Sequence, residues 1–440
     1  MRGHPGGDSY RALTHSGIRI VSASLERPSV SCVVPPWSVV RVARVALSNV
    51  VTTGCGIART DSGAVASIGL DAVAHNVRVL QQFAGHASVM AVVKADGYNH
   101  GGVEVARAAV AAGAQELGVT TIGEALELRA AGIDVPVLTW LHRVDSDFAA
   151  AITERVGIGV STSRQLDAVV DAAERVGDTA DVSLKIDTGL NRNGVAEADL
   201  DAVLDTTAAA VASGSVRLTA MFSHLACADE PDHPANDAQA ERLRDAVARA
   251  TRRGTPPAVV HLSNSAATLT RPDLGFDMVR PGIALYGLSP VPSLGMFGLR
   301  PVMTLSAQVV NIKTVSEGES VSYGYTWTAP TDTVVALVAL GYADGVVRSL
   351  SGRFEVTIAG RRYPSVGRVC MDQFVVDLGG DGSGVALGDE ALLFGTGDRG
   401  EANAQDWADA LDTISYEVVT GIRGRVRRRF VDARSGEATH

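Results

Sequence analysis

The chain has 440 residues, of which 46% are hydrophobic and 20% are charged, and its formal net charge at pH 7 is −10. This length allows two sizeable domains with large cores, and the acidic balance argues against non-specific binding to nucleic acid. No uninterrupted apolar run reaches the length of a membrane-spanning helix, so the sequence predicts a globular protein without a membrane partner.

The cysteines indicate where such a protein would work. The sequence has four of them, Cys32, Cys55, Cys227 and Cys370, with no CxxC pair and no metal-like spacing to histidine. This usage suits a reducing compartment, so we expect a cytoplasmic protein without a disulfide framework and without a metal site.

Residues 1–62 are compositionally distinct from the rest of the chain. They are rich in arginine, serine, glycine and proline, poor in acids, and show little periodicity. Their composition is superficially that of a transit peptide, but a disordered extension, or one that results from a non-native upstream start, is the favoured interpretation. We assign this extension no function.

Regular patterns begin at residue 65. Residues 65–70 predict a short strand, and Asp71 is expected to cap a helix that runs to residue 83. Eight short apolar strands then alternate with amphipathic helices, which predicts a (β/α)8 barrel. An open doubly wound sheet is the alternative, but no GxGxxG motif follows its first strand. The predicted strands lie near residues 88–94, 117–120, 136–139, 158–161, 182–187, 219–223, 259–262 and 278–284, and the helices between them include 163–176, 197–213 and 236–253.

Lys94 stands at the end of the first barrel strand. Only three of the 39 basic residues are lysine, namely Lys94, Lys185 and Lys313, and the others are arginine. Arginine supplies the generic positive charge here, whereas lysine can lose a proton, act as a nucleophile or base, and form a Schiff base. A lysine whose amine snorkels to the surface is the alternative, but this scarcity favours a chemical role for Lys94.

Other polar residues stand where later strands are expected to end. In a barrel, the strand ends and the loops that follow them build the active site. Each of these residues alone is a weak signal, but together they predict one site at one face of the barrel. They are Lys185, Asp187 and Arg192 after the fifth strand, His224 after the sixth, His261, Ser263, Asn264 and Ser265 after the seventh, and Arg280, Gly282 and Ile283 after the eighth.

The loops after the last two strands suit a phosphate group. Ser263, Asn264 and Ser265 offer hydroxyl and amide groups at a helix start, and Gly282 and Ile283 are expected to offer free backbone N–H groups. A phosphate pocket at one end of the site and a strand-end lysine at the other suggest pyridoxal 5′-phosphate.

The pattern changes after about residue 288. Two prolines and a glycine between residues 290 and 295 mark a boundary, and the stretches that follow alternate with period two, which predicts a second, mainly-β domain. Its arginine-rich end, residues 423–429, is interpreted as a solvated edge and not as a nucleic-acid patch. Strands are expected at 304–310, 333–340, 354–358 and 391–394, and helices at 404–411 and 414–420.

Eight motifs complete this pattern. They are AVVKADGYNHG (91–101), KIDTGLNRNG (185–194), HLSNSAA (261–267), MVRPGIALYG (278–287), SYGYTW (322–327), GYADG (341–345), VGRVCMDQ (366–373) and TISYEVVTGI (413–422). On these motifs the chain resembles the alanine racemases, a family of fold-type III pyridoxal phosphate enzymes. The resemblance implies an α/β fold, with an N-terminal (β/α)8 barrel followed by a C-terminal mainly-β domain. The boundaries would be an extension at 1–62, a strand and linker at 63–73, the barrel at 74–287 and the β domain at 288–440.

The resemblance implies two catalytic bases. Lys94 matches the lysine that holds the cofactor as a Schiff base and acts as one base, and Tyr323 matches the base on the opposite face. Racemisation needs both, because one group removes the α-proton and another returns a proton from the other side. Arg280 matches the arginine at the pyridine nitrogen, whose permanent charge disfavours protonation of that nitrogen and so limits side reactions.

Other roles follow from the same resemblance. His224 matches the histidine that links Arg280 towards the tyrosine base, and Arg192 matches the residue that contacts the cofactor's phenolic oxygen and the substrate carboxylate. Lys185 matches a lysine that is carbamylated in many members and orients this arginine. Tyr98, Ser265, Gly282, Ile283 and Tyr416 match the phosphate shell, and Tyr342, Cys370, Met371 and Asp372 match the substrate entrance and carboxylate end.

The family's architecture implies a head-to-tail homodimer that interconverts L-alanine and D-alanine, with D-alanine supplied to peptidoglycan. Each site would combine Lys94 of one chain with Tyr323 of the other. The chain departs from the family where Asn99 replaces the usual glycine of the lysine loop, and where residues 65–70 lack the common aromatic and acidic side chains. Asparagine tolerates a positive φ better than most non-glycine residues, so Asn99 is compatible with the same turn.

Three other functions are weighed against this one. A pyridoxal phosphate-dependent decarboxylase would have a catalytic cysteine, and an acidic residue at the pyridine nitrogen, where this chain has Arg280. A non-catalytic barrel protein that binds the cofactor would lack the β domain. A racemase of serine or of broad specificity stays open, because pocket size depends on the packing of a few side chains.

Overall fold

The computed structural model describes residues 63–431, except for the side chain of Ser383. The predicted extension at 1–62 and the end of the predicted β domain, 432–440, lie outside the described residues. Among the described helices, none combines the length and the apolar character that crossing a membrane requires.

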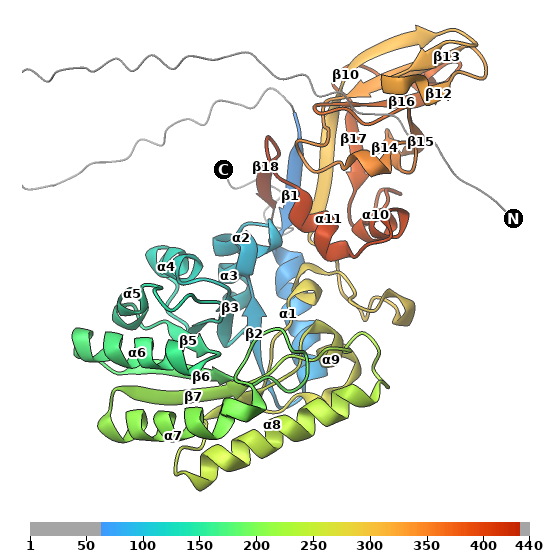
Figure 1. Ribbon diagram of the computed structural model, residues 1–440. Coiled ribbons are helices and arrows are strands. Elements are labelled where there is room, and N and C mark those ends of the chain that lie inside the picture. Colours follow the sequence, from blue (N-terminus) through green and yellow to red (C-terminus); the bar gives the residue numbers. More distant parts are fainter. Residues whose placement is uncertain (1–62, 432–440) are drawn as a thin grey trace, which may run out of the picture. The chain divides into compact units, whose positions relative to one another are not determined.

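Eight parallel strands close into a barrel, which confirms the predicted fold class (Figure 1). The ring closes where β2 pairs with β9, with Ser88 opposite Met278. The strands are β2 (Ser88–Val92), β3 (Glu116–Val119), β4 (Val137–Thr139), β5 (Gly157–Val160), β6 (Ala180–Lys185), β7 (Val216–Phe222), β8 (Val259–His261) and β9 (Met278–Val279). The helices of this part of the chain are α1 (Leu70–Ala84), α3 (Gly102–Ala111), α4 (Ile122–Ala130), α5 (Phe148–Thr153), α6 (Ser163–Val176), α7 (Glu197–Ser213), α8 (Pro234–Arg252) and α9 (Ser265–Thr270).

Helix α6 illustrates how the sequence forms the outer helices. Its buried side chains include Leu166, Val169 and Ala173, which recur at helical spacing and so form one apolar face. The Thr162 hydroxyl accepts a hydrogen bond from the backbone N–H of Gln165 and caps the first turn. The helix ends at Gly177, whose left-handed backbone (φ 75°) stops the helical path.

The structure corrects three local predictions. Helix α1 begins at Leu70, so Asp71 lies inside its first turn, where a carboxylate favours the helix dipole, and does not cap the helix. Strand β2 ends at Val92, so Lys94 opens the next turn, α2 (Lys94–Tyr98), instead of ending the strand. Strand β9 is two residues long, because Pro281 has no N–H for a strand ladder, and the chain turns into η2 (Ile283–Tyr286).

The second domain is built on an eight-stranded sheet with the order β13–β16–β15–β14–β17–β10–β1–β18. Strand β1 (Val65–Gly69) is antiparallel to β10 and parallel to β18, so strands from both ends of the described chain lie side by side (Figure 1). The other strands are β10 (Met303–Val315), β13 (Thr333–Val338), β14 (Glu355–Ile358), β15 (Arg361–Val366), β16 (Phe374–Gly379), β17 (Glu390–Phe394) and β18 (Arg427–Val431), with a separate pair, β11 (Ser320–Val321) and β12 (Trp327–Thr328).

Helices α10 (Ala404–Leu411) and α11 (Ser415–Gly421) precede the last strand. Trp407 of α10 is buried against the rings of Phe354 and Phe394, with centroid distances of 5.4 and 5.1 Å. Strand β18 then forms the edge of the sheet, where Arg427, Arg428 and Arg429 are exposed, as expected of a solvated edge.

A partly buried carboxyl group, that of Glu116, lies at the start of β3. Glu116 lies opposite Met90 of β2. Two residues further along, a Cβ at Gly118 would point at the ring of Trp140 and the sulfur of Met90, so Glu116 shares the inward face of the barrel. Burial raises the pKa of Glu116 to about 7.

We predict that Glu116→Gln stabilises the protein above neutral pH. The carboxyl group binds its proton more tightly in the folded chain, with a pKa of about 7 against an ordinary 4.5. Ionisation of Glu116 therefore costs no stability below pH 4.5. The loss in the free energy of unfolding grows between pH 4.5 and pH 7 and is complete above pH 7, where it reaches at most about 3 kcal/mol. Thermal unfolding at pH 8 and at pH 4.5 measures the difference.

The exposed Glu127 of α4 gives the matched control. Glu127→Gln should leave the unfolding temperature nearly unchanged at both pH values. An equal effect of Glu116→Gln at both pH values would contradict the assignment to ionisation.

Candidate active site

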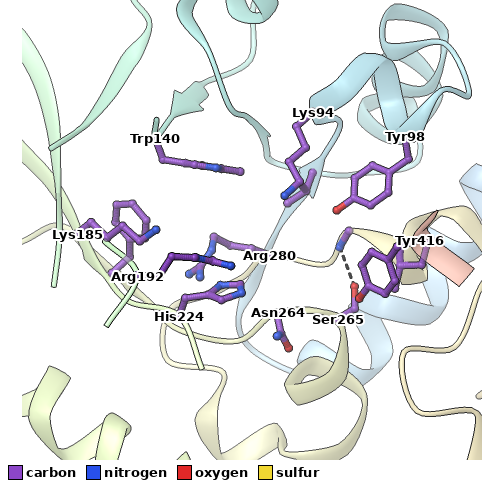
Figure 2. Close-up of a pocket in the computed structure, with 14 residues that line it drawn as sticks. Lys94, Tyr98, Trp140, Lys185, Arg192, His224, Asn264, Ser265, Arg280 and Tyr416 are labelled. Carbon is purple, nitrogen blue, oxygen red and sulfur yellow. Dashed lines mark hydrogen bonds between the residues drawn. The ribbon is translucent and has the colours of Figure 1, made fainter. Parts of the chain in front are cut away.

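A cavity of about 260 Å³ opens at the carboxyl ends of the barrel strands (Figure 2). Eleven of its fourteen lining residues belong to the predicted site: Lys94, Tyr98, Lys185, Arg192, His224, Asn264, Ser265, Arg280, Gly282, Ile283 and Tyr416. The other three, Val92, Trp140 and Phe222, were not predicted, because they are apolar or aromatic, although Val92 lies within the motif at 91–101. The sequence held only an indirect signal for Trp140: a glycine inside a predicted strand, Gly118, often marks the close approach of another group. In the structure, a Cβ at Gly118 would lie 2.7 Å from the Trp140 ring.

The cavity has two chemically different ends. Figure 2 shows Tyr98, Tyr416 and Ser265 on one side and Lys185, Arg192 and His224 on the other, with Lys94 reaching in between them. Hydroxyl groups thus gather at one end, and basic side chains, with the permanent cation Arg192 among them, gather at the other, cationic end.

Lys94 begins a turn with an unusual backbone. The four residues from Ala95 to Tyr98 all have positive φ angles between 53° and 60°, and Asn99 follows at 62°. Left-handed backbone is unfavourable for residues other than glycine, costing roughly 1–2 kcal/mol each, so this turn needs support from its surroundings. Part of that support comes from Glu124 of α4, whose carboxylate accepts the Ala95 N–H at 2.7 Å.

Further contacts hold the same turn. The Gly102 N–H donates to the Asp96 carboxylate at 2.7 Å, and the other Asp96 oxygen pairs with Arg428 of β18 at 2.5 Å. Glu124 was not among the predicted site residues. The sequence pattern that could have drawn attention to it is Thr121–x–x–Glu124, a capping box that the structure shows at the start of α4.

The surroundings of Lys94 favour its neutral amine. Burial lowers the pKa of Lys94, the nearby Arg192 lowers it further, and Glu124 opposes this in part. A neutral amine is the nucleophilic form of lysine, so the position suits covalent attachment to a carbonyl group.

Lys185 is buried among cations. Burial, followed by the charges of Arg280, Arg192 and Lys94, lowers its pKa to about 7, and Asp187 offsets only part of this. At neutral pH a substantial fraction of this amine is therefore uncharged, which makes it reactive towards electrophiles.

Arg280 is held by neutral partners. One guanidinium nitrogen donates to Nδ1 of His261 at 2.7 Å, and the other donates to the backbone carbonyl of Ser223 at 2.6 Å. Because His261 accepts at Nδ1, its own proton is on Nε2, and burial together with Arg280 lowers the pKa of His261 well below its usual value. Burial lowers the pKa of Arg280 to about 9, which still leaves it charged at neutral pH.

The histidine that bonds Arg280 is His261, a residue that the sequence placed at a strand end without a role. His261 stacks on Phe222, with ring centroids 4.8 Å apart and an interplanar angle of 7°. The predicted residue His224 lines the cavity instead, and burial and Arg280 lower its pKa well below the usual value. Within residues 63–431, His261 and not His224 is thus the direct histidine partner of this arginine.

The hydroxyl end of the cavity is tightly packed. Ser265 Oγ accepts the backbone N–H groups of Gly282 at 2.8 Å and Ala284 at 3.3 Å, so the prediction of a free N–H at Gly282 is wrong. A Cβ at position 282 would lie 2.3 Å from the Tyr98 hydroxyl, so only glycine fits there. Burial raises the pKa of both Tyr98 and Tyr416, which keeps their hydroxyl groups protonated and able to donate.

Eight predicted residues do not line this cavity: Asp187, His261 and Ser263 of the barrel, and five residues of the β domain. Tyr323 is 69% exposed, Met371 52% and Tyr342 39%. The loops that carry them are tied together, since the Tyr342 N–H donates to the Cys370 carbonyl at 3.0 Å and Asp372 pairs with Arg425 at 2.8 Å. Tyr323, Tyr342, Cys370, Met371 and Asp372 therefore lie on the β domain, outside the cavity of their own chain.

Comparison with known proteins gives one consistent result. Residues 68–290 match the model of the alanine racemase N-terminal domain, and residues 302–430 match that of the C-terminal domain. The alanine racemase of Mycolicibacterium vanbaalenii is 60% identical over 371 residues, which cover 84% of this chain and 95% of that protein. The alanine racemase of Mycobacterium tuberculosis is 56% identical over 370 residues, with coverages of 84% and 96%. The crystal structure of alanine racemase from Streptomyces lavendulae superposes with a TM-score of 0.82 at 48% identity, covering 84% of this chain and 97% of that chain.

We predict that Gly282→Ala damages the cavity. The added methyl group would meet the Tyr98 hydroxyl, and only a shift of the strained turn that carries Tyr98 would relieve this clash, so we expect a loss of about 1–3 kcal/mol in stability. Urea unfolding of the full chain measures the loss. The control is Gly123→Ala on α4, where a Cβ meets nothing closer than 3.9 Å. An unchanged stability of Gly282→Ala would contradict the close packing.

Proposed function

The chain belongs to the alanine racemase family and is an enzyme that racemises alanine, and from that premise we propose that it does so with pyridoxal 5′-phosphate bound at Lys94. The observation that carries this proposal is the cavity itself. A lysine with a lowered pKa lies between a hydroxyl-rich end and a cationic end. When bound there, the cofactor would supply the electron sink that acidifies the α-carbon of the amino acid.

The residues present fit such a cofactor. The hydroxyl groups of Tyr98, Tyr416 and Ser265 would face the phosphate, since neutral hydroxyls that cannot ionise are good donors to an anion. Arg280 would face the pyridine nitrogen. Within residues 63–431 its hydrogen-bond partners are a neutral histidine and the backbone carbonyls of Ser223 and Leu262, none of them a carboxylate, so its full positive charge disfavours a proton on that nitrogen.

The cationic end would bind the substrate carboxylate through Arg192. We propose that Lys185 becomes carbamylated, as the resemblance implies. Its neutral amine attacks carbon dioxide, forms an N–C bond and releases a proton, and the lysine then carries a negative charge. That charge would neutralise part of the repulsion among Lys94, Arg192 and Arg280 and would orient Arg192.

The second base would come from a partner subunit. Lys94 would hold or remove the α-proton on one face, and Tyr323 of the partner subunit would act on the other face. The exposure of Tyr323 and Met371 supports this arrangement, because large apolar side chains that gather on a surface commonly mark an interface. We therefore propose a homodimer whose active sites are shared between chains.

Two rival functions fit the site less well. A decarboxylase would need an acid at the pyridine nitrogen, but the partners of Arg280 there are His261 and Ser223. A barrel that only binds the cofactor would not need a β domain that presents tyrosines. The cellular role that we propose is the supply of D-alanine for peptidoglycan in the cytoplasm, in keeping with the free thiols of Cys227 and Cys370.

We predict that Lys94→Ala abolishes both cofactor attachment and racemisation, because no other amine in the cavity replaces it at this position. The measurement is the visible absorption of the purified chain, followed by an assay for D-alanine after addition of L-alanine. A Lys94→Ala chain that keeps the absorption band and the activity would contradict the assignment. An active wild-type chain without bound cofactor would contradict the proposed chemistry itself.

We predict that Tyr323→Phe lowers kcat by about 10²–10⁴, the range for loss of a general base, while the cofactor stays bound. The matched control is Tyr325→Phe, since Tyr325 is 75% exposed in the same turn, η4 (Tyr323–Tyr325). Equal rates for the wild-type chain and Tyr323→Phe would show that the second base is another residue.

A further inference from the structure

Asn99 connects the lysine turn to a helix of the β domain. It ends the left-handed turn that begins at Lys94, with φ 62° and ψ 18°. Its side-chain amide nitrogen donates a hydrogen bond to the backbone carbonyl of Thr420, 321 residues further along the chain. A glycine at this position would adopt the same backbone conformation, but it has no side chain to make this bond.

The carbonyl that Asn99 binds is one that the helix cannot satisfy itself. Thr420 is the next-to-last residue of α11, and the last carbonyls of a helix have no partner within it. Helix α11 has only seven residues, and no side chain caps its start. A helix of this length depends on external contacts for its position.

Helix α11 also carries a residue of the cavity. Tyr416 lies one turn before Thr420, and the Thr420 hydroxyl donates to the Tyr416 carbonyl at 2.6 Å. The Tyr416 ring lines the cavity, 6.2 Å from the ring of Tyr98. The lysine turn and the hydroxyl end of the cavity are thus joined through a short path from Asn99 to Thr420 to Tyr416.

We propose that Asn99 is a positioning residue that fixes Tyr416 at the phosphate end of the cavity by tying helix α11 to the turn that begins at Lys94. The inference rests on the proposed function, because it takes the ligand of Tyr416 to be the cofactor phosphate. The side chain that makes the tie is the one at which the lysine loop departs from the family's usual sequence.

Besides the ring contact of Tyr98 with Tyr416, two other contacts of this region reach β18. Asp96 pairs with Arg428 at 2.5 Å, and a Cβ at Gly101 would lie 2.6 Å from the ring of Phe430. Both Arg428 and Phe430 belong to β18 and not to α11. Breaking the Asp96–Arg428 pair therefore provides a control that weakens the support of the turn without touching the helix.

The test compares Asn99→Gly with Arg428→Gln in the full chain. Asn99→Gly removes the amide while it relieves the left-handed backbone, so any loss comes from the missing hydrogen bond. We expect Asn99→Gly to bind pyridoxal 5′-phosphate about 3- to 10-fold more weakly, the effect of one hydrogen bond. Binding of pyridoxal, which lacks the phosphate, should not change, because the tie acts through Tyr416.

Hydrogen exchange without cofactor gives a second readout. The amides of α11 should exchange about 3- to 10-fold faster in Asn99→Gly and at the wild-type rate in Arg428→Gln. Wild-type affinity of Asn99→Gly for the phosphate-bearing ligand, or an equal loss for pyridoxal, would overturn the inference alone. A wild-type chain that binds no pyridoxal 5′-phosphate would overturn the proposed function and this inference with it.

Discussion

The left-handed turn that begins at Lys94 is the constraint on which the rest of the site depends. Its non-glycine residues, Ala95, Asp96, Tyr98 and Asn99, each adopt a backbone that is unfavourable in isolation. The turn persists because groups from distant parts of the chain hold it: Glu124 from α4, Arg428 from β18 and the Thr420 carbonyl from α11. The position of one lysine is therefore set jointly by the barrel and by the β domain.

A second constraint is electrostatic. Lys94, Lys185, Arg192 and Arg280 are gathered around one cavity, and the charges of the arginines and of Lys94 lower the pKa of Lys185. Burial of so many basic groups, with only Glu124 and Asp187 to offset their charges in part, is unfavourable for folding. Their repulsion is relieved when an anion enters, so the same arrangement that costs stability creates affinity for a phosphate, a carboxylate or a carbamate. Neutral His261 accepts from Arg280 without cancelling its charge, which keeps that affinity intact.

The barrel and most of the cavity-lining residues could be predicted from the sequence. The remaining features could not, for physical reasons that differ from residue to residue. Helical periodicity predicted the bounds of α6 and α7 to the residue, and position at the ends of the predicted strands identified Lys94, Arg192 and Arg280 as site residues.

Trp140 and Phe222 were missed because, in a sequence, an apolar residue of a cavity wall cannot be distinguished from one of the core. The partnership of Arg280 with His261, and the use of the Gly282 N–H by Ser265, depend on side-chain geometry across strands that no spacing encodes. The roles of the exposed β-domain residues stay predictions, since none of these residues lines the cavity described in their own chain.

The sheet of the β domain explains why these distant supports can act together. Strand β1, which leads directly into α1 and the barrel, lies between β10 and β18. The same sheet thus holds the strand that enters the barrel and the last described strand, whose Arg428 and Phe430 contact the lysine turn. Loss of β18 would remove both a sheet edge and a support of the turn that begins at Lys94, although the residues of β18 are more than 300 positions away from Lys94 in sequence. In this fold the β domain is therefore part of the barrel's active site as well as the carrier of the residues proposed for the partner subunit.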